Sequence, residues 1–308
     1  MHGMMIKPEF LKKGGIAALI APAGHQPAET LEAAAACIER YGIIPKIYPS
    51  CRMQHGYLSG TDEARAKDVT DAFSDPDVSA VICLRGGYGC HRLFEYIDWE
   101  TVSRFPKFLY GYSDITALHS EISRRCGFMS WHSPMPGTEW TAGMDAFTER
   151  SLLSALFGPF PDVIANPSAA PLNIIADGET EGQLTGGNLT LLTASLGTSY
   201  EFDAEDKIIF IEDVHETPRN IDRMLLHLRH CGKFEDCRGV ILGTFSECEA
   251  LPGTPTLTLE EIFTELLSDI GKPVISNLQC GHSMPSMSLP LGAAVRISTK
   301  EKEIRVIS

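Results

Sequence analysis

Short apolar segments alternate with helical patterns along the first half of the chain. Four apolar runs, each followed by a turn-forming sequence, are expected to be buried strands. They cover residues 16–20, 43–48, 78–84 and 108–110. Apolar residues at helical spacing cover residues 30–41, 61–73 and 115–125. Because near-continuous apolar strands that alternate with helices are typical of parallel sheets covered on both faces, we predict an α/β domain here.

The second half of the chain contains more strand patterns than helix patterns. Strands are expected at residues 207–211, 239–242, 273–275, 294–297 and 304–307. Helices are expected at residues 218–230 and 259–270. This pattern predicts a smaller, β-rich α/β domain at the carboxyl-terminal end.

A proline-containing stretch with little periodicity separates the two halves. Phe160-Pro161, Asn166-Pro167 and Pro171 lie within it, with small residues between them. Such composition is typical of a linker. We therefore predict an amino-terminal domain over residues 1–165, a linker over residues 166–180 and a carboxyl-terminal domain over residues 181–308.

The composition and charge exclude several classes of partner. The chain has 308 residues, 44% of them hydrophobic, and a formal net charge of −14. It contains no cluster of Lys and Arg of the kind that neutralises nucleic-acid phosphates, and no run of roughly 20 apolar residues that would cross a membrane. We expect neither a nucleic acid nor a membrane as a partner.

The cysteines and the first residues indicate a cytoplasmic protein. The nine cysteines form no C-x-x-C pair, which argues against both a disulfide framework and a structural zinc site. Pro8 and Glu9 interrupt the stretch in which a signal peptide would need a continuous apolar run. A reducing compartment is the simplest setting for such a chain.

Ser113 is the first candidate for chemistry. It lies in Gly111-Tyr112-Ser113-Asp114, where a buried strand meets a helix. A serine on such a turn, at the carboxyl end of a parallel sheet, exposes its hydroxyl next to backbone N–H groups that can hold an oxyanion. The same pattern also fits a helix N-cap, in which Ser113 or Asp114 accepts a backbone hydrogen bond.

A second glycine-rich sequence, Arg85-Gly86-Gly87-Tyr88-Gly89, follows the third strand. Glycines let the backbone approach a ligand closely, and their N–H groups can hold an anion. The sequence matches neither the dinucleotide fingerprint nor the P-loop. An ordinary tight turn explains it equally well.

Carboxylates and a histidine follow strands of the second half. Glu212 and Asp213 end the strand at residues 207–211, and Gly281-His282 follows the strand at residues 273–275. A carboxylate can orient a histidine that acts as general base to a serine. Solvated charges before a helix are the alternative for the carboxylates, and a metal site near His215 matches no zinc template.

The complete set of motifs resembles the LD-carboxypeptidase family of serine peptidases, which includes the self-immunity enzymes that cleave microcin C. The resemblance covers almost the whole chain from Ile16. It rests on Arg85-Gly86-Gly87-Tyr88-Gly89, Gly111-Tyr112-Ser113-Asp114-Ile115-Thr116-Ala117, His132-Ser133-Pro134-Met135, Gly186-Gly187-Asn188-Leu189, Phe210-Ile211-Glu212-Asp213, Ile221-Asp222-Arg223, and Gly281-His282 followed by Leu289-Pro290-Leu291-Gly292.

The resemblance implies a Rossmann- or flavodoxin-like nucleophile domain, followed by a smaller β-rich domain that carries the Glu and His of a catalytic triad. Ser113 would be the nucleophile, Glu212 the acid and His282 the base. The backbone N–H groups of Asp114, Gly86 and Gly87 would form the oxyanion hole. Arg85 is our candidate for binding a substrate carboxylate, although a structural ion pair is equally compatible with it, and Tyr88 and His132 are expected to line the cleft.

The resemblance further implies the substrate and the assembly. The substrate would be a cytoplasmic murein tetrapeptide from which terminal D-Ala is released, and the enzyme would be a homodimer without metal or cofactor. One alternative is a peptidase of the microcin C branch, which accepts a peptidyl-nucleotide. Another is a non-catalytic protein that binds a nucleotide with its glycine-rich loops.

Overall fold

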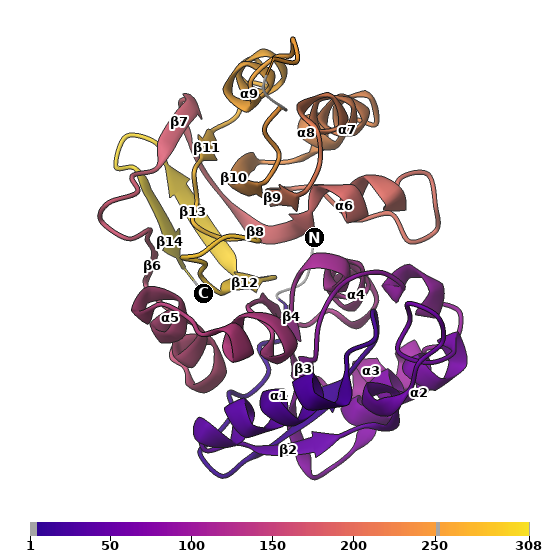
Figure 1. The fold of residues 1–308 in the computed structure, drawn as a ribbon. Helices are drawn as coiled ribbons and strands as arrows, with labels where there is room; N and C mark the ends of the chain where they lie inside the picture. Colours follow the sequence, from indigo (N-terminus) through magenta and orange to yellow (C-terminus); the bar gives the residue numbers. More distant parts are fainter. Residues whose placement is uncertain (1–4, 251–252, 308) are drawn as a thin grey trace. The chain divides into compact units, whose positions relative to one another are not determined.

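The computed structural model describes residues 5–250 and 253–307 and divides the chain into two compact units. The amino-terminal unit comprises Met1–Phe160 and Ser288–Gly292, and the carboxyl-terminal unit comprises Pro161–Met287 and Ala293–Ser308 (Figure 1). Residues 1–4, 251–252 and 308 of the expected domains lie outside the described residues. No helix within the described ranges has the length and apolar character that a membrane crossing requires.

The amino-terminal unit is built on a six-stranded sheet in the order β12-β5-β4-β3-β1-β2. All neighbouring strands are parallel except β12, which runs antiparallel to β5. The strands are β1 (Ile16–Ile20), β2 (Ile44–Ile47), β3 (Val78–Cys83), β4 (Phe108–Gly111), β5 (Ser130–His132) and β12 (Leu289–Leu291). The predicted parallel α/β sheet is therefore confirmed.

Helices of this unit follow the strands along the chain. The α-helices are α1 (Ala28–Arg40), α2 (Asp62–Ser74), α3 (Trp99–Arg104), α4 (Thr116–Glu121) and α5 (Ala146–Phe157). Three short 3₁₀ helices are η1 (Pro49–Arg52), η2 (Cys90–Leu93) and η3 (Ser113–Ile115). Two short π-helices are η4 (Ile122–Cys126) and η5 (Pro136–Trp140). The single helix expected at residues 115–125 is thus a succession of η3, α4 and η4.

The carboxyl-terminal unit contains an eight-stranded mixed sheet in the order β6-β14-β13-β8-β9-β10-β11-β7, of which β8 to β11 are parallel. The strands are β6 (Val163–Ile164), β7 (Asn173–Ala176), β8 (Glu179–Asn188), β9 (Lys207–Val214), β10 (Gly239–Ser246), β11 (Val274–Ser276), β13 (Ala294–Ser298) and β14 (Glu303–Val306). Its helices are α6 (Leu189–Ser195), α7 (Pro218–His230), α8 (Lys233–Asp236) and α9 (Leu259–Leu267).

One face of this mixed sheet packs against helices. Ile209 and Ile211 of β9 lie in a buried cluster with Ile221 and Leu225 of α7 and with side chains of α6 and α9 (Figure 1). Side chains of a strand alternate between its two faces. Glu212 therefore points to the face of β9 opposite to the helices.

The structure corrects three expectations about the organisation of the chain. The segment expected as a linker, residues 166–180, contains β7 and the first residues of β8. Residues 288–292, expected in the carboxyl-terminal domain, belong to the amino-terminal unit through β12. Two further helices, α6 and α8, lie in the half where only two were expected. These elements are short or polar, so that they lack the apolar periodicity by which the others were found.

Candidate active site

Ser113 lies on a tight turn directly after β4. Its φ is +65°, a left-handed conformation that is uncommon for residues other than glycine. Such strain is frequent at functional sites. The carbonyl of Gly111, two residues before Ser113, lies 2.8 Å from Nε2 of the buried His119, and this contact helps to hold the end of β4 in place.

Asp114 connects this turn to the glycine-rich loop. Its carboxylate is buried and accepts a hydrogen bond from the backbone N–H of Cys90, at 2.8 Å. The N-cap residues of η3 and α4 are Tyr112 and Ile115, and neither makes a capping hydrogen bond with its side chain. The N-cap explanation for Ser113 and Asp114 within their own helix is therefore wrong.

Gly86 packs directly against Ser113. A Cβ atom added at Gly86 would lie 2.8 Å from Cβ of Ser113, 3.0 Å from its Oγ and 3.4 Å from the backbone nitrogen of Asp114. No larger residue fits there without displacing the serine. The two glycine-rich strand ends, after β3 and after β4, thus meet at one place in the amino-terminal unit.

The other sequence-predicted residues of this unit have different environments. The Arg85 guanidinium is half-buried and donates through Nε to the Gly86 carbonyl at 3.2 Å and through Nη1 to the His25 carbonyl at 3.3 Å. Tyr88 is 54% exposed and packs edge-on against Tyr57. His132, by contrast, is 1% exposed, with its ring 5.4 Å from that of Tyr112. Arg85 thus bonds to backbone carbonyls, and the ion pair considered from the sequence is not formed among the described residues.

Arg65 is a residue of this region that the sequence did not single out. It is completely buried, and its Nη1 donates to the carbonyls of Pro22 and Gly89 while its Nη2 pairs with Asp62. It therefore connects the loops after β1 and β3 to α2. Because Arg65 lies in an ordinary charged helix pattern, nothing in the sequence distinguishes it from a solvated side chain.

Glu212 and His282 form a hydrogen-bonded pair in the carboxyl-terminal unit. Nδ1 of His282 lies 2.6 Å from Oε2 of Glu212, whose side chain is completely buried. A carboxylate at Nδ1 favours the tautomer in which Nε2 is the basic nitrogen. The sequence placed these residues at two strand ends, and the structure brings them together.

Gly281 allows this close approach. Its φ is +138°, and a Cβ atom added there would lie 2.8 Å from Oε2 of Glu212 and 2.5 Å from Oγ1 of Thr244. Only glycine combines this backbone conformation with this lack of space.

Asp213, the neighbour of Glu212, has a structural role. Its buried carboxylate accepts hydrogen bonds from Nδ2 of Asn188, from the N–H and Oγ1 of Thr190, and from the N–H of Val214, all at 2.8–2.9 Å. Burial raises the pKa of Asp213 above its usual value. Asp213 therefore attaches the start of α6 to β9, and Glu212 is the carboxylate that faces the histidine.

No metal-binding group of His, Cys, Asp and Glu side chains occurs within residues 5–250 and 253–307. The side chains considered for such a site pair elsewhere: His215 lies 3.2 Å from Glu247, and Glu216 accepts a hydrogen bond from Asn220. The sequence alternative of a metal centre near His215 thus has no support in the described part of the chain.

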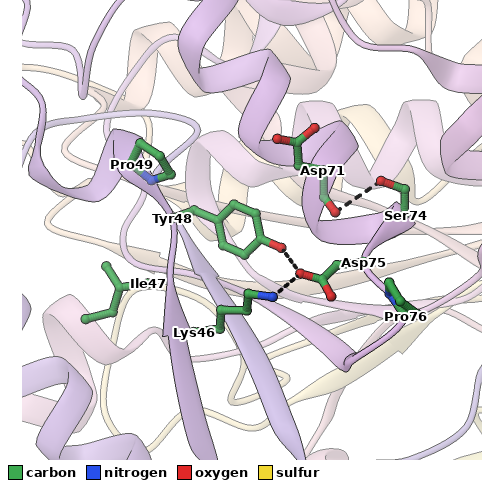
Figure 2. Close-up of a pocket in the computed structure, with 8 residues that line it drawn as sticks. All are labelled: Lys46, Ile47, Tyr48, Pro49, Asp71, Ser74, Asp75 and Pro76. Carbon is green, nitrogen blue, oxygen red and sulfur yellow. Dashed lines mark hydrogen bonds and ion pairs between the residues drawn. The ribbon is translucent and has the colours of Figure 1, made fainter.

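A cavity of about 560 Å³ in the amino-terminal unit lies apart from these residues (Figure 2). It is lined by residues of β2, of the segment after it and of the end of α2. Figure 2 shows that Lys46 and the hydroxyl of Tyr48 both bond to the carboxylate of Asp75, the tyrosine at 2.8 Å. The lysine, the tyrosine and the aspartate that line the cavity are thus paired with one another.

Comparison with known proteins identifies the two halves of the chain separately. Residues 17–133 match the LD-carboxypeptidase N-terminal domain, and residues 181–297 match the LD-carboxypeptidase C-terminal domain. A probable murein peptide carboxypeptidase of Bacillus subtilis is 36% identical over 96% of this chain and 92% of its own length. The murein tetrapeptide carboxypeptidase of Pseudomonas aeruginosa is 31% identical over 90% of this chain and 91% of its own length.

Solved structures agree with these matches. The muramoyltetrapeptide carboxypeptidase of Oxalobacter formigenes superimposes with a TM-score of 0.82 at 29% identity, covering 94% of this chain and 97% of that one. The microcin C7 self immunity protein MccF superimposes with a TM-score of 0.86 over 99% of both chains, but at 21% identity, which speaks to the fold alone. By its domains, its relatives and its fold, this chain belongs to the LD-carboxypeptidase family.

Proposed function

We propose that this protein is a serine-type LD-carboxypeptidase that releases the terminal D-Ala of murein tetrapeptides. The observation that carries the proposal is the hydrogen bond between His282 and the buried Glu212, which matches the base and acid of a serine hydrolase. The relatives at 36% and 31% identity, named for murein peptides, support the substrate class.

In this mechanism Ser113, His282 and Glu212 act together in two successive acyl-transfer steps. Nε2 of His282 takes the proton of the Ser113 hydroxyl as Oγ attacks the carbonyl carbon before D-Ala. The imidazolium then gives that proton to the amine of the departing D-Ala, and Glu212 stabilises the positive charge in the meantime. A water molecule, activated by the same nitrogen, hydrolyses the acyl-enzyme and restores Ser113.

The oxyanion of each tetrahedral intermediate would be held by backbone N–H groups. We assign this role to Asp114, which follows the nucleophile, and to Gly86 and Gly87. The packing of Gly86 against Oγ of Ser113 supports the assignment. Loss of one such donor typically lowers turnover by about 10²–10³.

Arg85 is the proposed partner of the substrate's terminal carboxylate. Its Nε and Nη1 bond to the Gly86 and His25 carbonyls, which holds the guanidinium beside the loop that meets Ser113. An orientated guanidinium can still bind a carboxylate through its other N–H groups. Tyr88, which is largely exposed, is proposed to line the peptide site, whereas the burial of His132 favours a role in supporting Tyr112.

The proposed setting is the cytoplasm, where murein peptides would be recycled. All nine cysteines are free thiols, as is usual in a reducing compartment. We also propose a homodimer on the family resemblance, which light scattering on the purified protein would test.

The first experiment incubates the protein with the L-Ala-γ-D-Glu-diaminopimelate-D-Ala tetrapeptide and follows D-Ala by mass. We expect release by the wild type and none by Ser113→Ala. The control is Ser103→Ala in α3, where the partly buried serine donates its hydroxyl to the Glu100 carbonyl of the same helix. A fluorophosphonate probe should label the wild type and Ser103→Ala only. Labelling without D-Ala release would refute the murein substrate and direct attention to peptidyl-adenylates. Absence of both would refute the serine hydrolase.

A further inference from the structure

His282 lies in a loop whose two ends are joined to each other. The loop follows β11, and its last residue, Met287, donates its backbone N–H to the carbonyl of Gln279 at 2.8 Å. The thiol of the buried Cys280 lies 3.3 Å from the carbonyl of Met287. The loop that carries the proposed base is therefore closed by hydrogen bonds between its own ends.

Ser286 holds the residue directly before the histidine. Its hydroxyl accepts a hydrogen bond from the backbone N–H of Gly281 at 3.2 Å and donates one to the Gly281 carbonyl at 3.0 Å. Ser286 is 4% exposed, so that these bonds form away from bulk water. A hydroxyl that both accepts and donates fixes both polar groups of one residue.

The preceding residue is attached to the sheet. The Cys280 carbonyl accepts hydrogen bonds from the backbone N–H of Thr244 at 3.0 Å and from its Oγ1 at 3.3 Å. Gly281 in turn packs against Glu212, as its lack of room for a Cβ atom shows. The backbone leading to His282 is thus held by β10 on one side and by Ser286 on the other.

We propose that Ser286 is a positioning residue that keeps the imidazole of His282 in hydrogen-bonding geometry with Glu212. The inference deepens the proposed function and rests on it. Without the hydroxyl, the N–H and carbonyl of the buried Gly281 would lose their partner, and such groups are rarely left unpaired. The loop would rearrange to satisfy them, and a displacement of about 1 Å at a catalytic group can lower turnover by about 10².

The test compares three serine variants of the same loop. We expect Ser286→Ala to lower kcat about 10- to 100-fold with KM changed less than about twofold. Ser286→Thr keeps the hydroxyl and should recover most of the activity. Ser283→Ala is the matched control, because Oγ of Ser283 is buried but makes no hydrogen bond with any described residue. It should behave as the wild type.

A second measurement distinguishes the positioning role of Ser286 from the proposed carboxypeptidase activity. The Nδ1 proton of His282, bonded to a carboxylate, should give a downfield ¹H NMR signal in the wild type and in Ser286→Thr. The signal should weaken or move in Ser286→Ala. If the wild type releases no D-Ala but the signals differ in this way, the positioning role stands and the proposed function fails.

Wild-type kcat together with an unchanged His282 signal in Ser286→Ala would overturn the proposal. If Ser286→Ala does not fold, Ser286→Cys replaces the hydroxyl by a somewhat larger thiol that forms weaker hydrogen bonds. A kcat for Ser286→Cys between those of the wild type and Ser113→Ala, with a shifted signal, would support the positioning role. A wild-type kcat together with a wild-type His282 signal in Ser286→Cys would contradict the positioning role.

Discussion

Nδ1 of His282 lies 2.6 Å from Oε2 of Glu212, a carboxylate with no exposed surface. Glu212 lies near the carboxyl end of β9 on the face opposite to the helices, and Gly281 leaves room for the contact. A hydrogen bond between a buried carboxylate and an imidazole is stronger than one in water, because the surrounding dielectric is low. The orientation of the proposed base is therefore determined within the carboxyl-terminal unit.

Replacement of Glu212 by glutamine should test this relationship. The amide keeps the shape but removes the charge, and its NH₂ group can stabilise the wrong tautomer of His282. We expect kcat/KM for D-Ala release to fall by about 10³–10⁴. Asp213→Asn is the matched control: it should lower stability, since Asp213 holds the start of α6, while the folded protein stays active. Full activity of Glu212→Gln would remove Glu212 from the triad.

Ser113→Gly should stabilise the protein while abolishing activity. A non-glycine residue at φ +65° costs about 1–3 kcal/mol, part of which the greater freedom of glycine in the unfolded chain offsets. We expect a gain of about 1 kcal/mol in the free energy of unfolding. Ser113→Ala should change it by less than about 0.5 kcal/mol. Urea denaturation measures both, and a less stable glycine variant would show that the turn is unstrained.

Gly86→Ala should inactivate the enzyme through a steric effect on the nucleophile. The added Cβ would lie 2.8 Å from Cβ of Ser113, so that the serine or the loop must move. We expect D-Ala release and fluorophosphonate labelling to fall by at least about 10². Gly127→Ala is the control: its left-handed backbone, with φ +68°, makes it destabilising, but nothing lies within 4 Å of a Cβ atom added there, so it should leave the nucleophile undisturbed. Equal labelling of the two variants would contradict the close packing of Gly86.

His119 should make stability depend on pH in a defined interval. Burial lowers its pKa from 6.5 to about 4. Below about pH 6.5 the unfolded chain binds a proton that the folded protein cannot accept, so stability falls as the pH is lowered from 6.5 and the effect levels off near 4. The loss is about 3 kcal/mol at most.

Thermal unfolding of the wild type and of His119→Gln across this interval checks the prediction. Glutamine can still donate to the Gly111 carbonyl but does not titrate. The difference in stability between the two proteins should therefore shift in favour of His119→Gln as the pH falls from 7 to 4. A difference that is constant with pH would show that His119 titrates normally.

Strands such as β1 and β9 could be predicted because burial on both faces leaves an almost uninterrupted hydrophobic run. β8 could not, because its sequence from Glu179 to Asn188 is rich in glycine and polar residues. β12, three residues with a proline in the middle, carries no pattern at all. Such strands are defined by pairing with distant partners, which local sequence does not encode.

The residues of the candidate site likewise divide into those that a local sequence pattern predicts and those that it does not. Strand ends followed by Gly, Ser, Glu or His pointed to Ser113, Glu212 and His282, since the chemistry of these residue types is specific. The strand pattern alone could not decide between Glu212 and Asp213, because alternation says only that they point to opposite faces. It was the family resemblance that selected Glu212. The roles of Arg65 and Ser286 depend on hydrogen bonds to the backbone of Gly89 and of Gly281, and only the three-dimensional arrangement reveals these bonds.

The pairing of β12 with β5 has a consequence for synthesis and for dissection of the chain. During translation, β5 stays an unprotected edge until residues 289–291 have left the ribosome, so the amino-terminal sheet cannot be completed while most of the protein is being made. A fragment ending at Phe160 would keep that edge exposed and should tend to aggregate. Appending Ser288–Gly292 through a short connection, or circular permutation, would be the way to express this half alone.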